Sequence, residues 1–495
     1  MSLLIKGVQV IDGTGKEPYK ADVLVQGGLI SSIGNLKERG AGKIIEGLGN
    51  YLVPGFIDIQ SHSDHYLSIF SNPKQEVYLK QGVTTILGGV DGSSLAPLLY
   101  GSLDSINMWS DISEVNVNWH TTQEFLYEME SRRLGINYGT FAGHSTIRRE
   151  LVGDRKNLEK KETDVLGRLV SEAIKGGAFG VSADLASAYG NPISLREANV
   201  VGNQIADKGS VYVVGLRDIR KGLIKSMQEV IKLAESTGAT IVIDNLRPVK
   251  GYIKEFREAL SLLKESATKL NLYFIIQPSE ISEVPIYSFL PDKLKSNNLG
   301  VMLAKVRDSK NGEIIKEALK EVDFRNMQVA SAPHHHFLVG KTIKQIAENW
   351  DINYIEAMQR LMEASDLKAT IFYEDINISS IRGYLGEERA LVTANATGVS
   401  SGGNYIENLT TSNIFPDYLR SVVREGLLSL EGAIKKLTSI PAKIFGIDNR
   451  GMIEEGMVAD LVLLGKSNYE VKQTILGGRI FGEDEIRGEI LRYYT

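Results

Sequence analysis

The sequence predicts an α/β protein, a TIM-like (β/α)8 barrel with a small composite β-sandwich domain built from both termini. Eight short apolar segments separated by helical stretches occupy the middle of the chain, which is the pattern of a parallel sheet with crossover helices. Segments with period-2 apolar residues and Gly pairs occur only at the two ends. The chain has 495 residues, which accommodates one barrel and an appended domain.

The eight candidate strands match the number that closes such a barrel. They span residues 51–60, 84–90, 138–143, 178–183, 211–215, 240–244, 272–276 and 390–394. Helical stretches lie between several of them, for example at 226–237 and 251–269. The gap between the seventh and eighth strands is longer than one helix. We therefore expect an insertion over residues 280–345, after which helices at 342–349 and 353–364 complete the crossover.

The two ends of the chain carry the same β-rich texture. Residues 3–35 read as short strands with tight turns, and the pattern returns at 457–465 and 469–480. One small sheet assembled from both ends explains this arrangement. We expect a composite domain of residues 1–54 and 441–495, with the barrel over 55–440.

Composition excludes several classes of function. The net charge is -5 and no long run of basic residues occurs, so nucleic acid is not an expected partner. The absence of Cys excludes disulfides and thiolate ligands, so any metal must be held by His, Asp, Glu or a modified Lys. No apolar window reaches the length of a membrane span. We expect a cytoplasmic protein that forms a homo-oligomer.

Catalytic groups in such barrels stand at the carboxyl ends of the strands, so the residues that follow each candidate strand form the candidate site. These residues are mostly polar: Gln60, His62, Asp64, Asp91, His144, Asp184, Gly215, Arg217, Asp244, Asn245, Arg247, Gln277 and Asn395. A guanidinium at Arg217 or Arg247 either pairs with the carboxylate of a small ligand or forms an ion pair with Asp184 or Asp244. The densest histidine cluster, 334–336, falls in the expected insertion and favours a solvated loop.

Several sequence blocks carry a resemblance to a known family. PGFIDIQSHSD (54–64), QGVTTILGGVDGSSLAPL (81–98), GGAFGVSADL (176–185) and LTSIPAKIFGIDNRGMIEEGMVADLVLL (437–464) resemble the N-acyl-D-amino-acid deacylase branch of the amidohydrolase superfamily. The resemblance runs nearly end to end. It implies hydrolysis of a non-peptide amide C–N bond by metal-activated water, with zinc as the cofactor and a small acylated amino acid or a related compound as the ligand.

The resemblance also implies which positions hold the metal, and most of them are substituted here. His62 keeps the second histidine of the family's His-x-His pair and is followed by the usual Asp64, but Gln60 replaces the first. Asp91 replaces a cysteine, and the histidines expected later fall on Gly215 and Asn245. The family's general base falls on Asn395, an amide that cannot take a proton from water.

These substitutions predict a lost or altered activity and leave two hypotheses. The first is an altered hydrolase with one metal on His62, Asp91 and either Asp64 or Asp244. The second is a non-catalytic binding or oligomeric scaffold protein, with no metal. The residues leave local alternatives: His62 binds a metal or only hydrogen-bonds to a carboxylate, and Asp91 is a ligand or a turn residue.

The resemblance and the strand-end positions also suggest roles for the remaining candidate residues. We place Asn395 and Asp64 at catalytic positions. We assign substrate contacts to His144, Arg217, Asn245 and Arg247, with a structural hydrogen bond as the alternative for His144.

Overall fold

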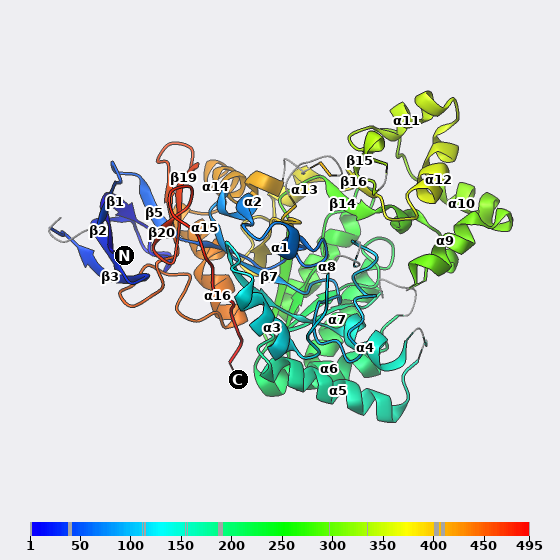
Figure 1. Cartoon of the computed structure of the whole chain (residues 1–495), viewed down its shortest axis with the longest axis horizontal. Coiled ribbons are helices and arrows are strands. Elements are labelled where there is room, and N and C mark those ends of the chain that lie inside the picture. Colours follow the sequence, from blue (N-terminus) through cyan, green and yellow to red (C-terminus); the bar gives the residue numbers. More distant parts are fainter. Residues whose placement is uncertain are drawn as a thin grey trace.

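The computed structural model describes residues 2–494 except 38–41, 111, 113–114, 154, 156, 187–191, 297, 334, 400–404 and 407–410. A β-sheet made from both termini lies at one end of the molecule, the barrel lies in the middle, and a helical insertion projects at the other end (Figure 1). No helix among the described residues has the length and apolar character needed to cross a membrane.

The predicted eight-stranded barrel is confirmed. Its strands in chain order are β6 (Phe56–Asp58), β7 (Val83–Gly88), β8 (Asn137–Thr140) continued by β9 (Ala142–Gly143), β10 (Gly180–Asp184), β11 (Val211–Gly215), β12 (Thr240–Ile243), β13 (Leu272–Ile276) and β17 (Ala390–Val392). All neighbouring pairs are parallel. The third strand is broken between β8 and β9, so β8 pairs with β7 and β9 pairs with β10.

Side chains close the barrel between its last and first strands. Thr393 Oγ1 and Ala394 N donate hydrogen bonds to the two carboxylate oxygens of Asp58 at 2.5 and 3.1 Å. His62 N donates to Ala396 O at 3.0 Å just beyond. These bonds join the carboxyl ends of β6 and β17 and fix the loops that follow them.

Amphipathic helices cover the outside of the barrel. They are α3 (Thr122–Ser131), α4 (His144–Val152), α5 (Lys160–Lys175), α6 (Leu195–Lys208), α7 (Leu223–Thr237), α8 (Ile253–Ser266), α14 (Ile414–Arg424), α15 (Leu430–Leu437) and α16 (Ser439–Phe445). In α6, buried Ala198, Val201 and Ile205 recur at helical spacing. The Ser194 hydroxyl caps its first turn by accepting from Glu197 N.

The terminal sheet combines both ends of the chain. Its order is β20-β19-β18-β5-β1-β2-β3, and β4 pairs with β1. The strands are β1 (Ser2–Val10), β2 (Tyr19–Gln26), β3 (Leu29–Gly34), β4 (Lys43–Glu46), β5 (Tyr51–Pro54), β18 (Leu461–Leu464), β19 (Val471–Leu476) and β20 (Arg479–Ile480). Residues 51–60 do not form the single strand we expected. They form β5 of the terminal sheet and β6 of the barrel, and Gly55 separates the two. A Cβ atom at Gly55 would lie 2.1 Å from Thr84 Oγ1, so this close approach requires glycine.

The insertion between β13 and β17 is longer than expected. Its three-stranded sheet contains β14 (Ser282–Pro285), β16 (Thr370–Tyr373) and β15 (Gln328–Ser331). Its main helices are α9 (Leu299–Arg307), α10 (Gly312–Lys320), α11 (Ile343–Trp350) and α12 (Tyr354–Ala364). The prediction that α11 and α12 complete the barrel crossover was wrong, because Ile343, Met358 and Leu361 pack in a separate core of the insertion.

Three short helices lie in connecting segments. They are α1 (Ser68–Ser71) and α2 (Glu76–Leu79) between β6 and β7, and α13 (Ile378–Arg382) between β16 and β17.

Candidate functional site

A cavity of about 340 Å³ opens at the carboxyl ends of the barrel strands. The polar side chains that line it include Gln60, His62, Asp91, Asp184, Asp244, Asn245, Arg247, Gln277, Glu283 and Asn395. They come from the ends of six barrel strands and from the insertion. Convergence of titratable groups from several strands at this end of a barrel is the arrangement of an active site.

His62 and Asp91 meet in this cavity. His62 Nε2 lies 2.7 Å from Asp91 Oδ2, and the Asp91 side chain keeps 30% exposure. Burial opposes the charged imidazolium, but the bond to Asp91 and the charges of Asp91 and Asp64 outweigh it and raise the pKa of His62. Burial also opposes the Asp91 carboxylate, yet the bond from His62 and the charge on His62 hold the pKa of Asp91 well below its usual range. The two residues form an ion pair.

The loop that carries Asp91 is held by buried side chains. Asp64 Oδ2 accepts from Gly89 N at 2.6 Å, and Ser182 Oγ accepts from Gly92 N at 3.0 Å. Asp91 itself adopts a left-handed backbone with φ of 52°. Asp64 is fully buried and does not line the cavity. It positions Asp91 and does not stand where substrate would react, contrary to our placement of Asp64 at a catalytic position.

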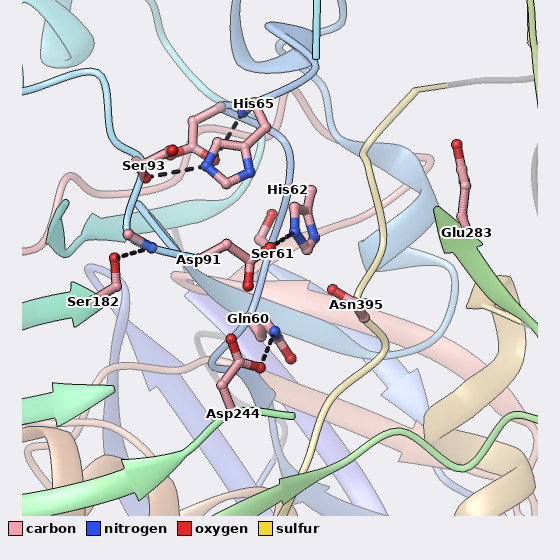
Figure 2. Close-up of polar contacts among 12 residues, drawn as sticks. Gln60, Ser61, His62, His65, Asp91, Ser93, Ser182, Asp244, Glu283 and Asn395 are labelled. Atoms are coloured by element: carbon pink, nitrogen blue, oxygen red, sulfur yellow. Dashed lines mark hydrogen bonds and ion pairs between the residues drawn. The ribbon is translucent and has the colours of Figure 1, made fainter. Parts of the chain in front are cut away.

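A second carboxyl group adjoins Asp91. The carboxyl groups of Asp91 and Asp244 interact, and this interaction lowers the pKa of Asp91 and raises that of Asp244. Gln60 Nε2 donates to Asp244 Oδ1 (Figure 2). Burial and the charge on Asp91 raise the pKa of Asp244 well above its usual value. Because the pKa of Asp91 is lowered and that of Asp244 is raised, Asp91 is ionised while Asp244 keeps its proton.

Asp184 stands beside this group at the end of β10. Burial, and next the charge on Asp91, raise the pKa of Asp184 to about 7. Its Oδ1 lies over Gly215, where an added Cβ atom would come within 3.2 Å of it. The glycine at a position where the resemblance implies a histidine therefore leaves room for the Asp184 carboxyl group.

His65 is a site residue that the sequence reasoning missed. One candidate ligand atom from each of His62, His65 and Asp91 lies within 4.8 Å of the other two. His65 is fully buried, and burial lowers its pKa. The spacing His62-x-x-His65 was a usable signal, because in a turn that leads into a helix residues three apart share a face.

Arg217 does not reach the cavity. Its guanidinium pairs with Glu229 on α7, with Nε 2.7 Å from Glu229 Oε2, and it donates to Leu185 O and Ile193 O. Arg217 therefore does not line the cavity, as a substrate contact would require. The alternative prediction, an ion pair with Asp184 or Asp244, was also wrong, because the partner is Glu229. The helix that follows Arg217 brings a carboxylate back to it, which strand-end counting cannot reveal.

Asn245 and Arg247 do line the cavity. Asn245 Oδ1 accepts from Leu216 N at 2.7 Å, which ties the ends of β12 and β11 together. Arg247 Nη1 donates to Ser282 Oγ at 2.8 Å, and its Nη2 lies 3.8 Å from Asp375 Oδ2. The Arg247 side chain keeps 33% exposure, so it can meet a ligand in the cavity.

Asn395 lies where the sequence placed it, beside the same cavity. Its backbone φ is 54°, and its Nδ2 lies 3.5 Å from Gln277 Oε1. Its Oδ1 is buried and has no hydrogen-bond donor within the described part of the chain. The amide is thus oriented by its neighbour and offers an acceptor, not a base.

The insertion supplies one wall of the cavity. Glu283 on β14 accepts hydrogen bonds from Tyr66, Thr370 and Tyr405 at 2.8 to 3.1 Å. Burial raises the pKa of Glu283. In the histidine cluster of the insertion, His334 lies outside the described residues, and His335 and His336 do not line the cavity.

His144 is turned away from the cavity. It is fully buried, its Nδ1 lies 3.2 Å from the Tyr212 hydroxyl, and it is absent from the cavity lining. The assignment of a substrate contact to His144 does not fit this position, and the structural alternative does. Burial, and then the charge on Arg148, lower the pKa of His144 to about 3.

We expect His144 to make the fold sensitive to acid. Its pKa is lowered from 6.5 to about 3, so its contribution to stability is complete above pH 6.5 and is lost as the pH falls towards 3. The slope corresponds to about 1.4 kcal/mol per pH unit. His144→Gln should flatten the dependence of unfolding free energy on pH between 6.5 and 4, as measured by denaturant titration. The same change at exposed His336 should leave the slope intact, and equal slopes in all three proteins would contradict the expectation.

Known sequences similar to this chain include amidohydrolases and N-acyl-D-amino-acid deacylases. The Amidohydrolase family matches residues 302–481. N-acyl-D-glutamate deacylase of Alcaligenes xylosoxydans xylosoxydans is 25% identical over 468 residues, which cover 94% of this chain and 87% of the relative. D-aminoacylase of the same organism is 23% identical over 470 residues, covering 93% and 87%.

Comparison with solved structures agrees on the fold. N-acyl-D-glutamate deacylase of Bordetella bronchiseptica, solved with zinc and a phosphonate mimic of the tetrahedral intermediate, superposes with a TM-score of 0.82 at 20% identity over 99% of both chains. A D-aminoacylase crystal structure superposes with a TM-score of 0.79 at 20% identity, again over 99% of both chains. Residues 302–481 thus match the Amidohydrolase family, and over most of its length the chain is similar to N-acyl-D-amino-acid deacylases.

Proposed function

We propose that this protein hydrolyses the amide C–N bond of a small acylated amino acid, with a catalytic site rebuilt from residues that differ from those of its relatives. The observation that carries the proposal is the convergence of His62, Asp91, Asp184 and Asp244 in one cavity at the carboxyl ends of the strands. Titratable groups with shifted pKa values that converge in one cavity are typical of catalytic sites.

The residues present fit a divalent metal ion of the kind bound by the deacylase of Bordetella bronchiseptica. His62 and Asp91 offer an imidazole nitrogen and an anionic carboxylate at one point, 2.7 Å apart. Both are donors that zinc prefers, but zinc needs about three protein ligands. Asp64 is not the third, because its oxygens accept from the backbone N–H groups of His65 and Gly89. A bound ion would polarise the amide carbonyl and acidify water.

Asp184 acts as the general base: it takes the proton of the attacking water, which the Asn395 amide cannot do. A pKa of about 7 divides Asp184 between its acid and base forms near neutral pH, as efficient proton transfer requires. Asp184 lines the same cavity as His62 and Asp91 and comes from the end of β10. Asp244, which keeps its proton, can donate to the departing amine.

Arg247 is placed to bind a carboxylate group of the substrate. Its guanidinium reaches the cavity and keeps part of its donor capacity free of the Ser282 and Asp375 contacts. Guanidinium groups bind carboxylates with two parallel hydrogen bonds. The relatives with similar sequences are named for N-acyl-D-glutamate, N-acyl-D-aspartate and D-amino acids, and such a carboxylate would lie against Arg247.

The proposal is tested by turnover. Protein loaded with zinc or manganese is incubated with a panel of N-acetyl-D- and N-acetyl-L-amino acids, and the free amine is quantified. We expect release of amine from at least one member, and none from His62→Ala prepared identically. Absence of turnover across the panel for a protein that holds metal would contradict it.

One observation favours a second candidate, a non-catalytic binding protein. Asn395 places an amide where relatives are expected to hold their base, and its Oδ1 acceptor suits a bound N–H group. This candidate predicts that acylated amino acids bind without being cleaved. Calorimetry with the same panel separates the two candidates, since binding without amine release supports only the second.

A further inference from the structure

We propose that His65 is a metal ligand through Nδ1 and that it completes, with His62 and Asp91, a site for one divalent cation. This ligand set supplies the third donor that the proposed hydrolase requires. His65 stands outside the positions at which the family resemblance implies ligands, so the site is a rearranged one.

The hydrogen bonding of His65 leaves one nitrogen available. Its Nε2 lies 3.1 Å from Ser93 O, a carbonyl that can only accept. Nε2 therefore carries the hydrogen, and Nδ1 presents a lone pair. His65 Nδ1 is buried and has no hydrogen-bond partner in the described part of the chain. An imidazole whose other N–H donates to a backbone carbonyl is the usual state of a metal-binding histidine.

The free nitrogen faces the other two donors. Figure 2 shows one ring nitrogen of His65 directed at Ser93 and the other on the side of the ring where His62 and Asp91 lie. The candidate ligand atoms of the three residues lie within 4.8 Å of one another, and His62 Nε2 lies 2.7 Å from Asp91 Oδ2. Ligands of a tetrahedral zinc ion stand about 3.3 Å apart, given bonds of about 2.0 Å. This value lies between the 2.7 Å that separates His62 from Asp91 and the upper limit of 4.8 Å for all three atoms.

Neighbouring residues hold the His65 ring in a fixed orientation. Trp109 stacks on it with ring centroids 5.0 Å apart and an angle of 12° between the planes. His65 N donates to Asp64 Oδ1 at 3.0 Å, and Asp64 also holds the loop of Asp91. The ring is completely buried. A donor that is already oriented loses little conformational entropy when it binds an ion.

Two further carboxyl groups that line the cavity, Asp184 and Asp244, already have other partners. Asp244 is engaged by Gln60 and by Asp91, and Asp184 bonds to Ala186 N. With three protein ligands, a fourth position of a four-coordinate ion stays open for water or substrate, as in catalytic zinc sites.

The test is a titration of the full-length, chelator-stripped protein with Co²⁺ alone, followed by visible absorption and calorimetry without substrate. The wild type should bind one ion per chain and develop the absorption of a low-coordinate cobalt site. His65→Asn and His65→Gln should each weaken Co²⁺ binding by more than about 100-fold, beyond the loss typical of an outer-shell change. His336→Asn, which removes an exposed histidine, should bind as the wild type does.

X-ray absorption of the cobalt-loaded wild type gives an independent count of imidazole ligands, which does not require any variant to fold. Two imidazoles are expected. A single imidazole, wild-type affinity in both folded His65 variants, or a wild type that binds no Co²⁺ would overturn the assignment. Because no substrate is present, a protein that binds cobalt through His65 and yet hydrolyses nothing would count against the proposed function alone.

Discussion

Asp184→Asn should lower kcat by about 10²- to 10⁴-fold, the range that general bases contribute. The substitution keeps an oxygen that can accept from Ala186 N, so the fold should survive. Burial raises the pKa of Asp184 to about 7, so its carboxylate form prevails only above that pH. The rate of the wild type should therefore rise with pH through 7 and then level off.

The measurement is a pH–rate profile from pH 5 to 9 for the wild type and for Asp184→Asn. The residual activity of the variant should lack the rise near pH 7. Asp207→Asn, at an exposed carboxylate on α6, is the matched control and should retain both the rate and the profile. A variant with full activity, or with the same rise near pH 7, would show that Asp184 is not the base.

Lys436→Met should destabilise the protein by about 3 kcal/mol, the scale expected when a buried charged donor is removed and its acceptors stay unpaired. Lys436 is buried on α15, and its ammonium group donates to Ala390 O at 2.8 Å and to Glu387 O and Glu388 O. These carbonyls lead into β17, the strand that closes the barrel. Burial lowers the pKa of Lys436 to about 8.

Equilibrium denaturation at pH 7 measures this effect. The neighbouring Lys435 is exposed on the same helix, so Lys435→Met should change the unfolding free energy by less than about 0.5 kcal/mol. Equal stability of the two variants would mean that the three carbonyls find other donors, and that Lys436 does not hold the start of β17.

The barrel was predictable because its buried strands are short, apolar and regularly spaced. Each of the eight predicted segments overlaps a barrel strand, and even the break after Thr140 lies inside the expected range 138–143. The sequence did not predict the core against which α11 and α12 pack. Their apolar stripes demand burial, yet an amphipathic pattern does not say which core supplies it, and these helices pack inside the insertion.

The candidate site was predictable where residues follow strand ends directly. His62, Asp91, Asn245, Arg247 and Asn395 all line the cavity. Prediction failed where a partner comes from another element. Arg217 is engaged by Glu229 from a later helix, and His65 lies in a turn whose path strand counting does not describe. The walls contributed by Trp109 and Glu283 depend on tertiary folding of distant segments.

The most direct test of a rebuilt one-metal hydrolase is turnover as a function of metal added to chelator-stripped protein. With an N-acyl amino acid that the protein cleaves, the rate should start near zero, rise in proportion to added zinc and level off at about one equivalent per chain. His62→Ala should stay inactive at every ratio. A rate that is independent of metal, or no turnover at any ratio, would contradict the account and leave the barrel mouth as a binding site.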